Sequence, residues 1–201
     1  MKYSFFTSSA SRRSCMQFAL GAASLLLIAS SPVLRADGDD NDEDHKRPPV
    51  VPANLQVPEG NRVVWHVYAV GVQIYTWQNI SSTDVPQYAW VFKAPEAILY
   101  DSEGQALGIH YAGPTWENEN GLVKGAVLQR ANSPDPNAIP WLLLQAVAHD
   151  GHGILSRVSY IQRVNTAGGK APAAGAGDSH VVGEELRVPY TAEYYFYRAQ
   201  N

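Results

Sequence analysis

The stretch GIHYAGPTWENENG, residues 108 to 121, holds the densest group of chemically capable side chains in this sequence: His110, Tyr111, Trp116 and Glu117. A histidine beside a carboxylate can act as a general base or a metal ligand. Aromatic faces with a polar edge suit a sugar ring or a small aromatic ligand. The glycines and the proline favour a kinked corner that projects the four side chains into one shared hollow. A purely structural alternative packs Tyr111 and Trp116 in the core, bonds His110 to a backbone carbonyl and uses Glu117 to cap the next turn.

A second group of polar side chains is the segment HDGHG, residues 149 to 153. It offers His149 and His152 as metal ligands, and a zinc site needs at least one more ligand, for which His66 or His110 is available. The three-residue spacing of the two histidines suits a helix face better than a hairpin tip. An ordinary polar turn is therefore the competing interpretation.

Three basic residues form a third candidate group. Arg157 and Arg163, together with Lys124, would clamp an anion if the fold brought them into one cavity. The alternative is that they are solvated or paired with glutamates. We count Arg163 and Lys124 with the residues from 108 to 121 as candidates for ligand binding.

Several kinds of chemistry lack their sequence signals. The only cysteine, Cys15, precedes an apolar run near the N-terminus, so thiol catalysis and zinc–thiolate sites are excluded from the rest of the chain. Neither GxSxG nor HExxH occurs, although a serine triad needs no local motif. The segment GAGDSH, residues 175 to 180, fails as a dinucleotide fingerprint because His180 replaces the third glycine and no βαβ pattern surrounds it. We expect no cofactor.

The elements that must position these side chains are strands. From residue 50 onward the segments are short, rich in β-branched and aromatic residues, and separated by Gly, Pro, Asn and Asp. The expected strands are residues 62–69, 71–78, 87–93, 97–101, 106–111, 122–130, 141–149, 154–166 and 187–198. The segment from 139 to 149 also fits a short helix. Nine strands at this spacing predict an all-β, single-domain antiparallel sandwich or barrel.

Alternation in the last expected strand assigns its faces. Its more apolar side points inward and comprises Val188, Tyr190, Ala192, Tyr194 and Phe196. Pro189 removes one ladder donor, which predicts an edge or a bulge there. In the segment from 154 to 166, Arg157 and Arg163 share one side with Leu155 and Ile161. That side is therefore either exposed to solvent or part of the lining of a polar cavity.

The first 36 residues have the pattern of an export signal. A basic head with Arg12 and Arg13 precedes an apolar run from Phe18 to Ala29, which is too short to span a membrane. SRRSCMQF also fits a twin-arginine signal, and the general export route is the alternative. With cleavage after Ala36, the chain is periplasmic or extracellular and keeps no transmembrane segment.

Removing residues 1 to 36 changes the formal charge. The segment carries four of the 15 basic residues and none of the 19 acidic ones, so the remainder stands at 11 − 19 = −8. Residues 37–49, DGDDNDEDHKRPP, are expected to form an acidic disordered linker before a β-rich domain at 50–201. This charge argues against nucleic acid as a partner, since phosphate contacts need clustered Lys and Arg. The pattern does not indicate an oligomeric state.

Five motifs carry a family resemblance: GVQIYTW, GIHYAGPTWE, IPWLLLQA, YIQRVNTAGGKAP and VPYTAEYYFYR. Together they resemble a family of secreted bacterial and fungal proteins classed as a domain of unknown function, over residues 50 to 198. Some fungal members carry the label malate dehydrogenase, which the missing nucleotide fingerprint does not support here. The resemblance implies a cysteine near Trp77 and another near Gly177 in many members, and this chain has neither. It supplies no catalytic residues.

These observations favour an exported β-domain that binds a small polar ligand or a glycan without catalysis, around residues 110 to 117. A first alternative is a hydrolase or metal-dependent enzyme that uses His110 with Glu117. A second alternative is a purely structural secreted protein. The position of His110, Trp116 and Glu117 relative to one open pocket distinguishes these hypotheses.

Overall fold

The computed structural model describes residues 47–173 and 180–200. The expected export signal and most of the acidic linker lie outside the described residues. Two short 3₁₀ turns, η1 (Ala53–Leu55) and η2 (Ile154–Arg157), accompany eight strands. The strands are β1 (Asn61–Asn79), β2 (Tyr88–Tyr100), β3 (Ala106–Tyr111), β4 (Thr115–Asn118), β5 (Gly121–Ala131), β6 (Trp141–Gly151), β7 (Tyr160–Gly168) and β8 (Glu185–Ala199).

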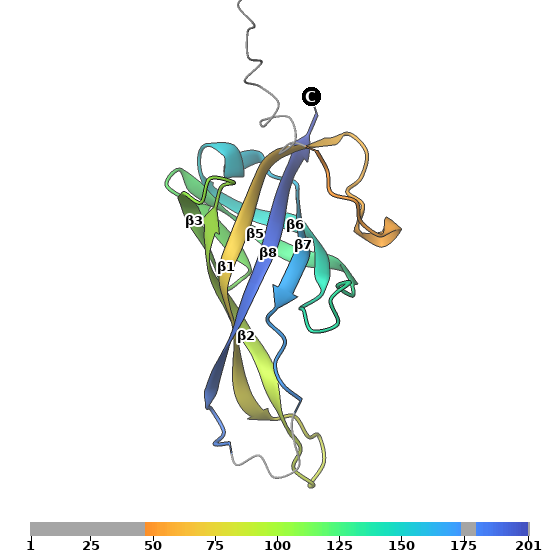
Figure 1. Ribbon diagram of the computed structural model, residues 1–201, viewed down its shortest axis with the longest axis vertical. Coiled ribbons are helices and arrows are strands. Elements are labelled where there is room, and N and C mark those ends of the chain that lie inside the picture. The colour runs from red at the N-terminus through yellow and green to blue at the C-terminus, as the bar shows by residue number, and fades with distance from the viewer. Residues whose placement is uncertain (1–46, 174–179, 201) are drawn as a thin grey trace, which may run out of the picture. The chain divides into compact units, whose positions relative to one another are not determined.

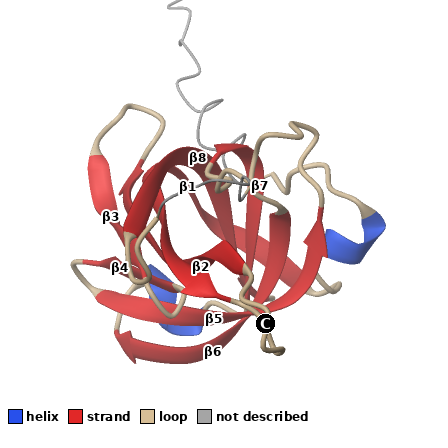
Figure 2. Cartoon of the chain, turned by 90° about the horizontal axis from the view of Figure 1, so that it is seen from below, coloured by secondary structure: helices blue, strands red, loops and turns tan. Residues whose placement is uncertain are grey.

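The strands form one antiparallel sheet that closes into a barrel in chain order, with β8 paired to β1. Figure 2 shows the strands arranged in a ring. The expected all-β fold is thus confirmed, and of the two expected architectures the barrel is the one found. Within the described residues, no helix has the length and apolar character needed to cross a bilayer.

The nine expected segments map onto these strands with four differences. Residues 62–69 and 71–78 are parts of one strand, β1, and residues 87–93 and 97–101 are parts of β2. The four-residue strand β4 corresponds to no expected segment, because Gly113 and Pro114 favour a corner at this position. Residues 154–157 form the turn η2 instead of the start of a strand. The segment that also fitted a helix is the strand β6.

The long strands extend beyond the short ones. β1, β2 and β8 continue past the ends of their neighbours at the lower end of Figure 1. Pro189 fits this arrangement, because the pairing of β7 with β8 ends at Tyr190 and Pro189 has a ladder partner only on β1. Pro95 is similar: it pairs with Gln73 on β1, whereas pairing of β2 with β3 begins at Ala97. Proline has no backbone N–H, and both prolines are tolerated because each lies where its strand has a paired neighbour on one side only.

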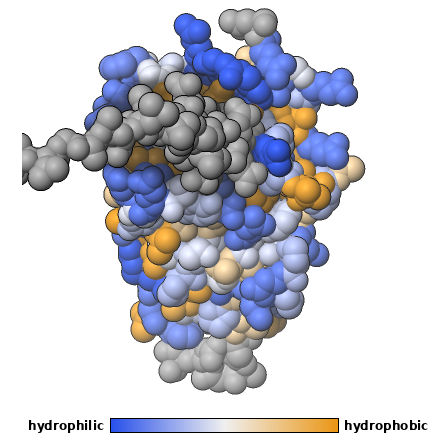
Figure 3. Space-filling view, turned by 45° about the horizontal axis from the view of Figure 1, so that its top comes forward, coloured by the Kyte–Doolittle hydropathy of each residue, from blue (hydrophilic) through white to orange (hydrophobic). Residues whose placement is uncertain are grey.

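The core fills the barrel. Inward alternation on β8 holds for Tyr190, Ala192, Tyr194 and Phe196, which are buried with the main apolar cluster, whereas Val188 is only partly buried. Tyr195 and Tyr197, on the other face, are also buried, in a second cluster that Val51 and Val57 of the N-terminal segment cover. The surface shown in Figure 3 is mainly hydrophilic, with apolar side chains in separate patches.

Candidate functional site

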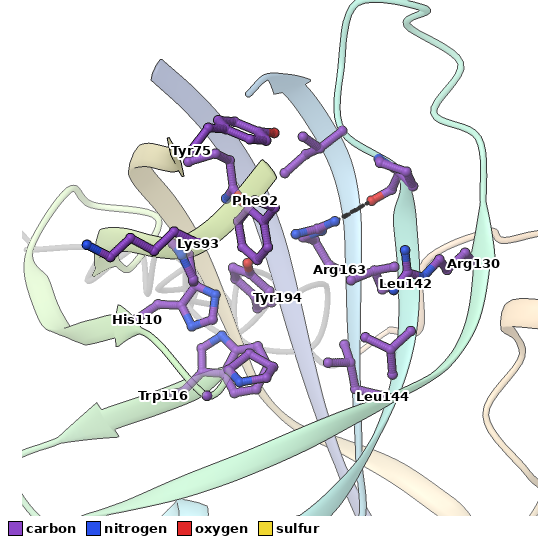
Figure 4. A pocket seen from close by; sticks show the side chains of 17 residues that line it. Tyr75, Phe92, Lys93, His110, Trp116, Arg130, Leu142, Leu144, Arg163 and Tyr194 are labelled. Atoms are coloured by element: carbon purple, nitrogen blue, oxygen red, sulfur yellow. Dashed lines mark hydrogen bonds between the residues drawn. The ribbon is translucent and has the colours of Figure 1, made fainter. Parts of the chain in front are cut away.

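The barrel encloses a cavity of about 300 Å³, at the small end of the volumes that hold small-molecule ligands. An eight-stranded barrel has an interior just wide enough for side chains or for one small ligand. The lining comes from all eight strands and two loops: Gln73, Tyr75, Phe92, Lys93, Pro95, His110, Gly113, Pro114, Trp116, Val127, Arg130, Ile139, Pro140, Leu142, Leu144, Arg163 and Tyr194. Figure 4 shows the stacked His110 and Trp116 on one side, Leu142 and Leu144 on the other, and Arg163 and Tyr194 between them.

The cavity is bordered by the tip of the β3–β4 hairpin. That hairpin ends at residues 112–114, while β2 and β5 continue past it and contribute Phe92, Lys93, Val127 and Arg130. These four side chains are exposed, so they form the rim of the cavity. Pairing irregularities lie on both rim strands. They skip Lys93 on β2 and Leu128 on β5.

The irregularity on β5 explains why Arg130 belongs to the cavity. Strict alternation from the buried Val123 would place residues 125, 127 and 129 inward and Arg130 outward. Val127 pairs with Leu144, whereas Arg130 pairs with Leu142, so Leu128 is an extra residue on β5. After Leu128 the even-numbered residues of β5 point inward in place of the odd-numbered ones. Both Val127 and Arg130 then line the cavity.

His110 and Trp116 form one wall because they are cross-strand partners. His110 on β3 pairs with Trp116 on β4, so both side chains lie on the same face of the sheet. Their rings stack with centroids 4.5 Å apart, and both side chains are at most 2% exposed. The ring of Tyr194 meets both edge-on, at 5.1 Å from His110 and 5.3 Å from Trp116.

The same pairing places Tyr111 and Glu117 on the opposite, outer face. Tyr111 donates a hydrogen bond to Oε2 of Glu117 at 2.7 Å, which raises the pKa of the Tyr111 phenol. The expectation that all four side chains share one hollow is therefore wrong: alternation divides them into an inner and an outer pair. An enzyme that uses His110 with Glu117 has no support in this geometry, because the sheet separates the two groups.

His110 is a neutral group in this site. Its Nδ1 lies 2.8 Å from the carbonyl oxygen of Thr115, which can only accept, so Nδ1 carries the proton. Burial lowers the pKa of His110 to about 3, and the charge of Arg163 adds to this shift. Nε2 is then left with a lone pair, which makes His110 a hydrogen-bond acceptor toward the cavity.

Arg163 supplies the positive charge inside the barrel. The side chain is only partly buried, and its Nε and Nη2 both donate to the carbonyl oxygen of Pro140, at 3.2 and 2.8 Å. Burial is the largest influence on the pKa values of Tyr75 and Tyr194, raising both, and the charge of Arg163 acts in the opposite direction on each. The charge of the guanidinium therefore influences the pKa values of tyrosines on two other strands, β1 and β8.

Several buried polar atoms around the cavity have no hydrogen-bond partner within the described residues. They include Nε2 of Gln73, Nε1 of Trp116 and the hydroxyls of Tyr190 and Tyr194, although Tyr190 lies close enough to Gln73 and Tyr194 for poorly aligned hydrogen bonds to influence its pKa. Most buried polar groups in folded proteins form hydrogen bonds, so these atoms are unusual for a protein interior. Gln73 and Tyr194 were not singled out as site residues. A signal existed for both: inward alternation of residues 73, 75 and 77, and of 190, 192, 194 and 196.

The remaining candidates lie away from the cavity. Lys124 is exposed, and it is adjacent along β5 to the buried Val123 and Gly125. Arg157 lies at the end of η2 and lines a separate hollow with Arg62 and Arg198. The expected clamp of Arg157, Arg163 and Lys124 does not form, and of the three only Arg163 reaches the cavity.

The histidine candidates for a metal site are separated as well. His149 bonds to the carbonyl of Val158 at 2.8 Å, and His152 is exposed in the turn after β6. His66 stacks on Tyr195 and lies 2.9 Å from Oε2 of Glu193. Among the residues that the structure describes, no three side chains from His, Cys, Asp and Glu are grouped to hold a metal ion.

A family model described as "Protein of unknown function (DUF3455)" matches residues 58–198 of this chain. The chain belongs to the DUF3455 family. The match spans β1 to β8 almost completely and confirms the resemblance drawn from the five motifs. The DUF3455 region therefore includes every lining residue of the cavity and all of the strand residues except Ala199. Searches of curated proteins and of solved structures found no match to the chain.

Proposed function

We propose that this DUF3455 protein is an exported, noncatalytic binding module that holds one small molecule inside its barrel. The observation that carries the proposal is a cavity with mainly apolar walls, around which polar atoms of Gln73, Trp116 and Tyr194 form no well-aligned hydrogen bond. Binding sites for small molecules combine an apolar lining with a few fixed polar groups in this way. The cavity volume of about 300 Å³ favours a small ligand over a glycan.

The chemistry of the lining favours binding over catalysis. General acid–base catalysis works best with a group whose pKa lies near the working pH. Burial holds the pKa of His110 at about 3, and the outer face holds Glu117. His110 is thus suited to accept a hydrogen bond from a ligand and poorly suited to take its proton.

Export is supported by the basic head and the short apolar run of residues 1 to 36. Fusing these residues to a reporter that works only outside the cytoplasm tests this part of the proposal. A reporter that stays in the cytoplasm would contradict it. Replacing Arg12 and Arg13 by lysine distinguishes the two routes, because only the twin-arginine route requires the arginine pair.

Ligand binding is tested with two fluorescent compounds of suitable size, the neutral N-phenyl-1-naphthylamine and the anion 2-naphthoate. We expect at least one to bind to the purified protein in a saturable, one-to-one manner. Val127→Trp places a bulky side chain at the rim and should weaken binding about tenfold, a change of about 1.4 kcal/mol. Val147→Trp is the matched control, because Val147 is 60% exposed on β6 and does not line the cavity.

Two results would overturn the proposal. One is that neither compound binds the wild-type protein. The other is that Val127→Trp binds as tightly as wild type and Val147→Trp, which would place the bound compound outside the barrel. Thermal unfolding of both variants shows whether either substitution has damaged the fold.

A further inference from the structure

We infer that the cavity selects a small organic anion, a carboxylate on an apolar or aromatic body, whose charged group lies against Arg163. This inference rests on the proposed function and adds the chemical class of the ligand. It comes from the geometry of Arg163, the absence of a counter-charge and the division of the cavity into a polar and an aromatic part.

The hydrogen bonds of Arg163 to Pro140 use only part of its guanidinium, and the Tyr194 hydroxyl lies close enough that its hydrogen bonding with Arg163 lowers the Tyr194 pKa. A guanidinium has five N–H donors in a planar fork. Nε and one N–H of Nη2 point to the carbonyl oxygen of Pro140. The remaining donors are on Nη1 and on the far side of Nη2, which is the edge that binds a carboxylate through two parallel hydrogen bonds.

The carbonyl that orients Arg163 is itself fixed. The backbone N–H of Ile139 donates to the carbonyl of Gly168 at 2.9 Å, and Oγ1 of Thr166 donates to the carbonyl of Ile139 at 2.6 Å. Ala138 forms a bridge with Gly169. Pro140 is therefore held against the end of β7, and the guanidinium of Arg163 is oriented before any ligand arrives. Such preorganisation lowers the entropic cost of binding.

The cavity has no negative charge to match this cation. Within the described residues, no Asp or Glu lines the cavity, and Arg163 forms no ion pair. The full chain is acidic, with a formal net charge of −4, so an acid-free lining is not a consequence of composition. Removing a cation from water without a partner is costly, which makes an anionic ligand the natural counter-charge.

Two further cations lie at the rim. Lys93 and Arg130 are both exposed there. Lys93 forms an ion pair with Glu185, so part of its charge is already matched. Arg130 is a residue of β5 whose inward direction depends on the extra residue Leu128. A cationic rim raises the rate at which an anion reaches the cavity.

The aromatic wall of the cavity indicates what the uncharged part of the ligand is. His110, Trp116 and Tyr194 present aromatic rings, and Leu142 and Leu144 face them. A flat apolar body fits between an aromatic wall and an aliphatic one. Nε2 of His110 can accept one hydrogen bond from a hydroxyl on that body.

The test compares two ligands of the same shape that differ in charge, 2-naphthoate and 2-naphthamide. We measure the dissociation constant of each by calorimetry with the full chain at neutral pH. Hydrogen bonds to a charged group contribute about 1.5–3 kcal/mol, so wild type should bind naphthoate roughly 10- to 150-fold more tightly than naphthamide. Arg163→Gln should remove most of this preference, and Arg163→Lys should keep part of it.

Arg157→Gln is the matched control, since it removes the same charge from an arginine outside the cavity. The inference is overturned if naphthoate and naphthamide bind equally, or if Arg163→Gln keeps the wild-type ratio. Either result leaves the proposed function standing, because binding itself is retained. If Arg163→Gln fails to fold, Arg163→Lys still decides the question, since a purely structural arginine would leave the ratio unchanged.

Discussion

At the scale of single residues, burial determines what His110 can do. The side chain is 2% exposed, donates from Nδ1 to Thr115 and has its pKa lowered to about 3 from an ordinary 6.5. In the unfolded chain His110 therefore takes up a proton near pH 6.5, whereas in the folded chain His110 remains neutral until about pH 3. The contribution of neutral His110 to the free energy of unfolding is fully present above pH 6.5, and it is lost as the pH falls toward 3.

This difference predicts an acid-sensitive fold. Between pH 7 and pH 5, His110 should lower the free energy of unfolding by about 2 kcal/mol, because each unit of pH contributes about 1.4 kcal/mol once the unfolded chain is protonated. Urea unfolding at both pH values measures the change. His110→Gln should show a much smaller loss. His152→Gln, altered in the exposed turn, should behave like wild type, and an equal loss in all three proteins would refute the role of His110.

At the scale of elements, strands were read from the sequence more reliably than their ends. Alternation identified the inward face of β8, including Tyr194, because side chains in a strand repeat every two residues. The partner of each strand was not readable, since pairing register depends on residues far apart in the chain. Glu117 illustrates the consequence: only the register of β3 with β4 shows that it lies opposite Ile109, on the outer face. Arg130 was missed because one extra residue in β5 reverses the alternation.

One misplaced strand end lies beside a glycine, Gly71. The expected strands 62–69 and 71–78 are separated at Val70, next to Gly71, and glycine often weakens or interrupts a strand. In the structure Gly71 lies within β1 opposite Ala97, where the two backbones approach closely. A Cβ at this position would lie 2.1 Å from the carbonyl oxygen of Glu96 and 2.5 Å from the Cβ of Ala97. The glycine thus permits a long strand instead of ending a short one.

This close approach predicts the effect of a single methyl group. Gly71→Ala should destabilise the protein by about 1–3 kcal/mol, because β1 and β2 must separate locally to admit the side chain. Denaturant unfolding gives the value. The neighbouring Val70→Ala is the control: Val70 is 52% exposed, and its truncation should change stability by less than about 0.5 kcal/mol. A Gly71→Ala protein as stable as the control would show that the strands do not approach as described.

At the scale of the whole molecule, closure of the barrel depends on its last strand. β8 pairs with β1 from Asn61–Ala199 to Thr76–Glu185, and with β7 on its other side. It also supplies Tyr190, Ala192, Tyr194 and Phe196 to the main core. Because β1 and β8 lie at opposite ends of the sequence, the cavity that holds Arg163 exists only when the chain is almost complete. Folding that depends on such distant contacts is expected to be slow.

The dependence on β8 predicts that the barrel can be divided and reassembled. A chain ending at Glu184 leaves β1 and β7 each without one partner and removes the aromatic wall residue Tyr194, so it should lose cooperative thermal unfolding and the binding of 2-naphthoate. Adding a peptide of residues 185–201 should restore both, because an exposed sheet edge accepts a strand through main-chain hydrogen bonds. A peptide with Tyr194 and Phe196 replaced by aspartate keeps the backbone donors but places charges in the core, and it should restore neither. A shortened chain that unfolds cooperatively and binds naphthoate without any peptide would mean that the cavity forms without closure, and that the ligand contacts attributed to the interior lie elsewhere.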